Sequence, residues 1–320
     1  MYRQFWIPIM LTAFALSPFA LEEIQEPDSL SRLPAAVLLT GYPPFKLFVT
    51  SEKETWKLQE EGSSFYVHPS MSGDGRIIAS ARLGHDSSSR EVLAVATYSM
   101  LNRKWTEHEQ IVDFRRGIAI SPDGSRLAFA VRDPVIKGIR LRIIDLKTGK
   151  MSSSPEIGKH DRIDLSWSPD GRSVVYDMNQ SLLHESPRHG VFVLDLESGK
   201  ISKIVEGRAP SWSPSGEWIA FLESSESPSQ GQWIYAPGSD RLSVIRPDGT
   251  GSRVLVTLPK DRYFAASPVW SPDSSRILLN ELWDSEKGTV RIHLLDVSTL
   301  KLTTTKFKDV PPVFGWAVAR

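Results

Sequence analysis

Ser121-Pro122-Asp123-Gly124 returns 47 residues later as Ser168-Pro169-Asp170-Gly171, and this repeated tetrapeptide decides the fold. Weaker copies stand at Ser72-Gly73-Asp74-Gly75, Ser213-Pro214-Ser215-Gly216 and Ser271-Pro272-Asp273-Ser274. From the first copy along the chain to the last, the spacings are 49, 47, 45 and 58 residues. A self-similar period of this length is typical of a propeller or another repeat array.

Each tetrapeptide lies between two strand-like runs, such as Leu165-Ser166-Trp167 before it and residues 173–177 after it. Proline presets the backbone angle of a turn, aspartate suits the next position and glycine tolerates a positive φ, so the pattern predicts a hairpin. A second hairpin of alternating apolar residues follows each one, for example over residues 191–201. Four strands recurring at this period form a propeller blade, and we expect the tryptophan before the turn to pack between blades.

The two ends of the chain supply the strands that are missing from one unit. The second hairpin of the unit occurs six times, if the one over residues 46–58 is included. The first hairpin, around the tetrapeptide, is complete only five times. Residues 314–318 match the strand before the turn, and residues 35–39 match the strand after it. The sequence therefore predicts an all-β, six-bladed β-propeller of four-stranded blades, closed by a composite blade made from both termini, which removes free sheet edges.

Composition excludes several classes of protein. The 320 residues are 40% hydrophobic, enough for a substantial core, and carry a net charge of zero with both signs well mixed. Nucleic-acid binding needs a basic patch or stripe, so we expect none. The chain has no cysteine, which excludes disulfides, thiolate metal sites and a thiol nucleophile.

The N-terminal segment is typical of an export signal. Arg3 precedes a run that is almost wholly apolar over residues 5–16, and small residues follow before Glu22. We expect a signal peptide over residues 1–20, a polar linker over 21–34 and the propeller over 35–320. The alternative is an uncleaved anchor, although Pro8 interrupts a stretch that is short for a membrane span. These features predict a periplasmic or secreted monomer with no stable membrane span after signal cleavage.

The phrase Trp-Ser-Pro-Asp-Gly at residues 167–171, followed by a β-rich run, resembles the TolB-like family of WD-like propeller repeats. The resemblance covers about residues 35–320. It implies the fold, and it implies one of several functions, because such repeats occur in periplasmic binding components, in the propellers of prolyl-oligopeptidase-type peptidases and in polysaccharide-active enzymes. The α/β domain that precedes the propeller of TolB has no counterpart here, so its partner-binding region is not carried over.

The search for chemistry gives no catalytic constellation, no cofactor and no metal site. His184 and His189 are five residues apart in an expected loop, which leaves a loop metal site open against a solvated loop. Asp123, Asp170 and Asp273 stand in turns, where hydrogen bonds to the local backbone are the expected role.

Arginines recur just before the innermost strand of several units. Arg116, Arg162 and Arg208 stand five or six residues before the motif serine, and Arg262, followed by Tyr263, resembles a displaced copy. At the mouth of the central channel, guanidinium groups would favour a carboxylate or a phosphate. The alternative is a structural arginine that caps loop carbonyls or pairs with a neighbouring aspartate, since repeated positions often serve the repeat itself.

The longer connections between strands, on the side of the channel mouth, are a second indication of where function lies, because variable loops on a rigid scaffold carry function. The main insertion, at residues 223–240, contains Trp233 and Tyr235, which either form an exposed aromatic platform or pack inward. Together these features predict a non-catalytic binding module of the bacterial envelope, with a protein or an anionic ligand at the channel mouth. The alternative is a carbohydrate-active or peptidase-like enzyme in the funnel, with Asp86, Asp133, His85 and His184 as candidates.

Overall fold

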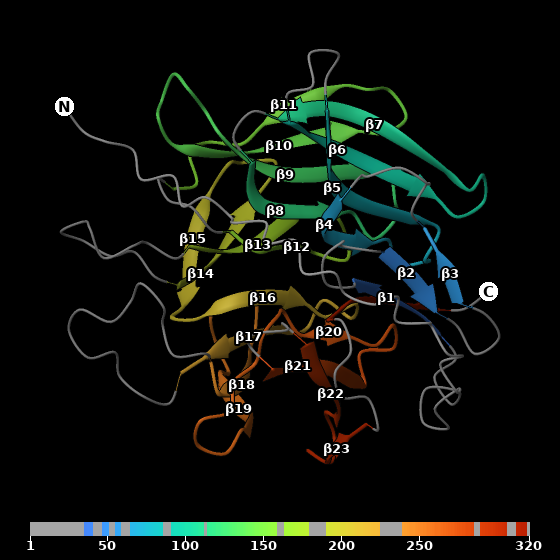
Figure 1. Ribbon diagram of the computed structural model, residues 1–320. Coiled ribbons are helices and arrows are strands. Elements are labelled where there is room, and N and C mark those ends of the chain that lie inside the picture. Colours follow the sequence, from blue (N-terminus) through green and yellow to red (C-terminus); the bar gives the residue numbers. More distant parts are fainter. Residues whose placement is uncertain are drawn as a thin grey trace, which may run out of the picture.

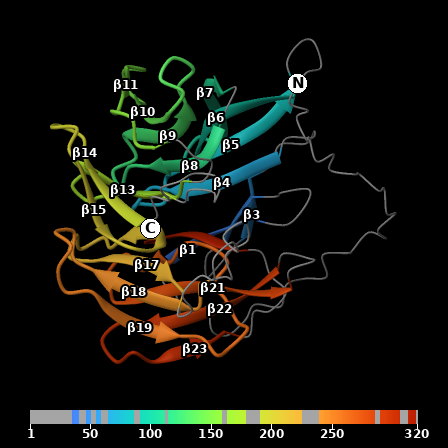
Figure 2. The ribbon, with the colours of Figure 1, turned by 90° about the vertical axis from the view of Figure 1, so that its left-hand side faces the viewer.

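A computed structural model describes residues 35–40, 47–50, 55–58, 65–85, 91–111, 114–158, 163–178, 190–224, 239–284, 289–305 and 312–318. The expected signal peptide and linker lie outside these residues. The described chain forms six antiparallel four-stranded sheets, which follow one another in chain order (Figures 1 and 2).

One sheet joins the two ends of the chain. In pairing order it consists of β24 (Val313–Val318), β1 (Ala35–Thr40), β2 (Leu47–Thr50) and β3 (Thr55–Lys57). Val37 of β1 pairs with Trp316 of β24, and Ala36 pairs with Ala317. The pairing of the two terminal segments that the repeat count predicts is therefore present.

The other five sheets each use four consecutive strands. Their strands are β4 (Phe65–Met71), β5 (Ile77–His85), β6 (Glu91–Ser99) and β7 (Lys104–Ile111); β8 (Phe114–Ile120), β9 (Arg126–Arg132), β10 (Ile139–Asp145) and β11 (Met151–Ser153); β12 (Leu165–Trp167), β13 (Ser173–Met178), β14 (Gly190–Asp195) and β15 (Ile201–Val205); β16 (Arg208–Trp212), β17 (Ile219–Glu223), β18 (Arg241–Ile245) and β19 (Arg253–Thr257); β20 (Val269–Trp270), β21 (Arg276–Asp284), β22 (Thr289–Asp296) and β23 (Leu302–Thr304). The first strands touch in a cycle: β24, β4, β8, β12, β16, β20 and back to β24.

The motif turns are built by their own side chains, as the sequence predicts. Asp123 Oδ1 accepts the hydroxyl of Ser121 and the backbone N–H of Ser125, and Ser121 Oγ accepts the N–H of Arg126. The copies at Asp170 and Asp273 repeat these bonds. The pKa of each of these aspartates lies below its ordinary value, because the bonds stabilise the carboxylate.

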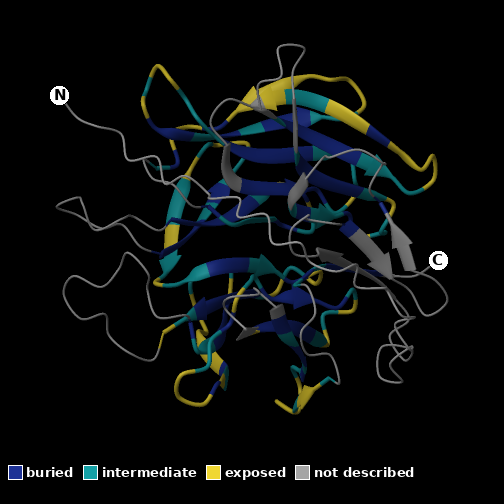
Figure 3. Ribbon diagram, viewed as in Figure 1, coloured by how far each residue is buried: buried dark blue, intermediate teal, exposed yellow. Residues whose placement is uncertain are grey.

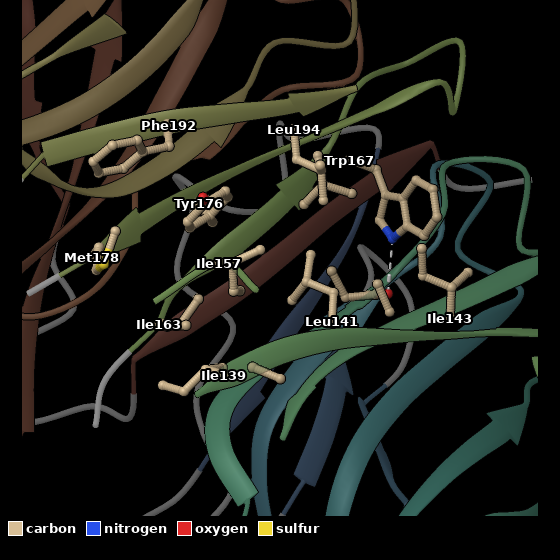
Figure 4. Close-up of a cluster of buried hydrophobic side chains, with 14 residues drawn as sticks. Ile139, Leu141, Ile143, Ile157, Ile163, Trp167, Tyr176, Met178, Phe192 and Leu194 are labelled. Carbon is tan, nitrogen blue, oxygen red and sulfur yellow. Dashed lines mark hydrogen bonds between the residues drawn. The ribbon is translucent and has the colours of Figure 1, made fainter. Parts of the chain in front are cut away.

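The core lies between the sheets. Trp167 packs against Leu141 and Ile143 of the preceding sheet, and its indole N–H donates to the carbonyl of Ala119 at 3.0 Å (Figure 4). Trp270 repeats this bond with the carbonyl of Ser211. Trp167 and Trp270 thus anchor their sheets to the previous one, as expected, whereas the indole N–H of Trp212 donates to Gly216 O within its own turn. Burial falls toward the outer edge, so that β9 is largely buried whereas all three residues of β11 are exposed (Figure 3).

Candidate functional site

The two ends of the ring differ in how they are built. At the end that carries the motif turns, neighbouring turns bind one another: the N–H of Gly73 donates to Pro122 O at 2.8 Å, and that of Ser215 donates to Ser274 Oγ at 2.9 Å. The guanidinium of Arg126 reaches Gly171 O. The opposite end, where first strands begin and second strands finish, carries the longer connections. We call this end the mouth, and it is the candidate functional face.

Arg208, at the start of β16, binds two connections: Ser239 lies between β17 and β18, and Phe264 lies between β19 and β20. Its Nε donates to Ser239 Oγ at 2.6 Å and its Nη2 donates to Phe264 O at 3.1 Å. Phe264 is buried, and its backbone bridges Ser239 on one side and Glu281 on the other. Arg208 therefore ties two sheets together at the mouth, and this bonding matches the structural alternative.

Arg262 makes a bidentate ion pair with Glu281 of β21. The side chain of Arg262 is 35% exposed and that of Glu281 only 2%, so the pair leads from the surface to the interior. Burial opposes ionisation of Glu281, but the hydrogen bonds from Arg262 and His293 outweigh it and lower the pKa of Glu281. Tyr263 is half-buried beside the pair, and its carbonyl accepts the N–H of Leu282.

The remaining predicted site residues cannot be placed. Arg116 lies in β8, but its side chain is outside the described residues. Arg162, Trp233 and Tyr235 fall wholly outside them. The proposed arginine ring therefore stays a prediction, as does the aromatic platform.

Of the residues considered for the enzyme alternative, only Asp133 is described in full. Asp86 and His184 lie outside the described residues, and only the backbone of His85 is described. Asp133 caps a local turn, accepting the N–H groups of Val135 and Ile136 and facing Arg140 at 3.3 Å.

A buried carboxylate at the mouth escaped the sequence reasoning. Asp177, near the end of β13, is 5% exposed and accepts the N–H of Asp164 and that of Ala209, both at 2.7 Å. Burial, reinforced by the charge of Asp164, raises the pKa of Asp177 to about 7, against the opposing effects of these hydrogen bonds and Arg208. The bond to Ala209 fixes the next sheet, where Ala209 adopts a φ of 52° beside a bulge in β16.

The same contact recurs two sheets further on, made by an amide. Asn280, fully buried, donates to Val313 O at 2.9 Å and accepts the N–H of Val313 at 2.8 Å. Asp177 and Asn280 both stand nine residues after the motif serine, where two other copies carry Ala81 and Ala130. A polar residue at that offset is the signal by which the sequence could have revealed these contacts.

Within the ranges described above, no group of three His, Cys, Asp or Glu side chains could hold a metal ion. The same part of the chain contains no helix with the length and apolarity that a membrane crossing requires.

Comparison with known proteins places this architecture. No family model matches the chain. It is 25% identical over 253 residues to the Tol-Pal system protein TolB of Francisella tularensis, a match that covers 64% of this chain and about half (54%) of that protein. The crystal structure of TolB from Acinetobacter baumannii superposes with a TM-score of 0.63 at 14% identity, covering 88% of this chain and 66% of the other. An oligogalacturonate lyase in complex with manganese gives 0.53 at 15% identity, covering 84% and 72%.

Antiparallel four-stranded sheets whose first strands meet in a ring define an all-β propeller. Among propellers, this chain resembles TolB, and the match spans about half of that protein's length.

Proposed function

We propose that this chain is an exported, monomeric, six-bladed propeller of the bacterial envelope that binds a protein partner at its mouth without chemistry there. The observation that carries the proposal is the similarity to the Tol-Pal system protein TolB over 253 residues. Six four-stranded sheets with contacts between successive first strands support the blade count. The expected signal over residues 1–20 supports a periplasmic or secreted location.

The bonding at the mouth supports a rigid binding surface. Arg208 and Arg262 fix the connection around Phe264 from two sides, and Asp177 fixes Ala209 on the next sheet. Because these segments are ordered before a partner arrives, binding costs little loop entropy. The half-buried guanidinium groups of Arg208 and Arg262 at this rim would favour a partner segment that carries carboxylates.

The test is capture of a partner from envelope extract by the purified chain. Arg116, Arg162 and Arg208 are changed together to Ala, and Lys147 and Lys150, on a hairpin tip at the opposite end, are changed to Ala as the matched control. A partner held by the wild type and the control but lost by the arginine variant supports binding at the mouth. A partner held equally by all three excludes this rim, and absence of any partner argues against the interaction role.

A second candidate is a carbohydrate-active or peptidase-like enzyme in the funnel. The observation that favours it is the placement of Asp164 close to the buried Asp177 at the mouth, beside Arg208. Paired carboxylates serve the acid–base hydrolysis of glycosides. Turnover of oligosaccharides or peptides that disappears in Asp164→Asn would favour this function over the first.

A further inference from the structure

A row of hydrogen-bonded polar side chains crosses the β20–β23 sheet and begins at Glu281, the buried partner of Arg262. Glu281 of β21, His293 of β22 and Thr304 of β23 share one face of the sheet. His293 pairs with Leu279 on one side and with Thr304 on the other, and Glu281 follows Leu279 by two residues, so its side chain is on the same face. His293 Nε2 lies 2.5 Å from Glu281 Oε2, and His293 Nδ1 lies 3.1 Å from Thr304 Oγ1. Hydroxyl, imidazole and carboxylate thus stand in the order that activates an oxygen nucleophile.

The neighbours of His293 fix its tautomer. Glu281 is held ionised by the bidentate Arg262, so its oxygens only accept and Nε2 of His293 must carry the proton. Burial lowers the pKa of His293, more than the Glu281 bond raises it, so the ring is neutral at pH 7. In the neutral ring Nδ1 is a free acceptor, and the hydroxyl of Thr304 donates to it.

Solvent exposure differs among these three side chains. The side chains of His293 and Glu281 are 1% and 2% exposed, whereas Thr304 is exposed. Thr304 ends β23, the outermost strand of its sheet, and among the described residues no further strand pairs beyond it. The base is therefore shielded from water while the hydroxyl is open to a reactant.

The repeat shows that the fold does not require this polar set. By register, Met178, Phe192 and Lys203 occupy the same three positions in the β12–β15 sheet, where Met178 and Phe192 are core residues (Figure 4). In the β16–β19 sheet the positions hold Glu223, whose carboxylate accepts the hydroxyl of Ser243, and Val254. Buried polar groups contribute little net stability compared with apolar packing, and neither of these two sheets carries the full set of carboxylate, imidazole and hydroxyl, so the set in the β20–β23 sheet calls for another role.

We propose that Thr304 is a nucleophile, activated by His293 and Glu281, that accepts an acyl group from carboxylic esters. Thr304 Oγ1 attacks the ester carbonyl carbon while its proton passes to His293 Nδ1. The ester C–O bond then breaks, and the leaving alcohol takes that proton from His293. An acyl-Thr304 ester remains, which water hydrolyses to the free acid and the Thr304 hydroxyl. Thr304 and His293 are the catalytic residues, and Glu281 is a positioning residue.

The test is incubation of the purified chain with p-nitrophenyl acetate, following nitrophenolate release and mapping the acetylated peptide by mass. The variants come from the chain's own repeat: Thr304→Val as in Val254, and His293→Phe as in Phe192. The matched control is Thr97→Val, because Thr97 Oγ1 also bonds a histidine, at 2.7 Å from His108 Nε2, but His108 has no carboxylate bond among the described contacts.

The proposal expects acetyl at Thr304 in the wild type and in Thr97→Val, none at that residue in Thr304→Val, and a rate about 10²–10⁴-fold lower in His293→Phe. Glu281→Gln should also shift the pH at which the rate is half-maximal, which a purely structural role would not do. If His293→Phe fails to fold, His293→Gln takes its place. Absence of acetyl at Thr304, or its formation at an unchanged rate without His293, overturns the proposal. Neither result bears on partner binding at the mouth.

Discussion

Asn280→Ala should strongly destabilise the protein, because one side chain holds the closing strand. Its amide makes two bonds to the backbone of Val313, at 2.9 and 2.8 Å, and both residues are buried. Truncation leaves a buried N–H and a buried C=O without these partners. At about 1–3 kcal/mol for each unpaired group, the free energy of unfolding should fall by about 2–6 kcal/mol.

Urea denaturation followed by tryptophan fluorescence measures this loss. Alanine itself fits the position, since Ala81 and Ala130 occupy it in two other sheets, so steric conflict does not confuse the result. Asn280→Asp is the informative companion: it keeps the acceptor for the Val313 N–H but places a second acceptor against the Val313 carbonyl. Its stability should therefore fall as pH rises and the buried acid ionises. A loss below about 1 kcal/mol in Asn280→Ala would refute this account of ring closure.

Three other outcomes are expected. Deleting residues 313–320 removes β24 and should abolish the cooperative thermal transition or lower its midpoint sharply; an unchanged melting curve would exclude closure by this strand. Tyr176→Phe should raise the free energy of unfolding by about 1–3 kcal/mol in urea titrations, because the fully buried hydroxyl has no hydrogen-bond partner among the described residues, and a destabilised variant would reveal one. Folding raises the pKa of Asp177 to about 7 from an ordinary value near 4, so the folded state holds a proton that the unfolded chain releases; stability relative to Asp177→Asn should decline as pH rises from about 4 to 7, and a rise would contradict the assignment.

Most of the fold could be predicted from local patterns in the sequence. The Ser-Pro-Asp-Gly turns are completed by bonds within five residues, so their structure follows directly from the tetrapeptide. The pairing of β1 with β24 follows from counting, because each unit needs four strands. In both cases one repeat supplies the template for the next.

The site was harder to predict from the sequence, because its contacts join strands and connections that lie far apart along the chain. Arg208 was recognised as a recurring arginine, but its acceptors, Ser239 and Phe264, lie 31 and 56 residues away. His293 looked isolated in the sequence, because Glu281 and Thr304 reach it only through the register of three strands. Periodicity identifies what each unit shares, whereas these contacts depend on where a single unit departs from the others.

The join between β1 and β24 also determines when the protein can finish folding. β24 is the last described strand to be synthesised, and its partner is the first, so the longest loop must close before this sheet exists. Until then β1 presents an unpaired edge, which is an aggregation hazard. The sheet that closes the ring therefore cannot form before β24 has been synthesised, and the free edge of β1 stays open to pairing with other chains until that moment.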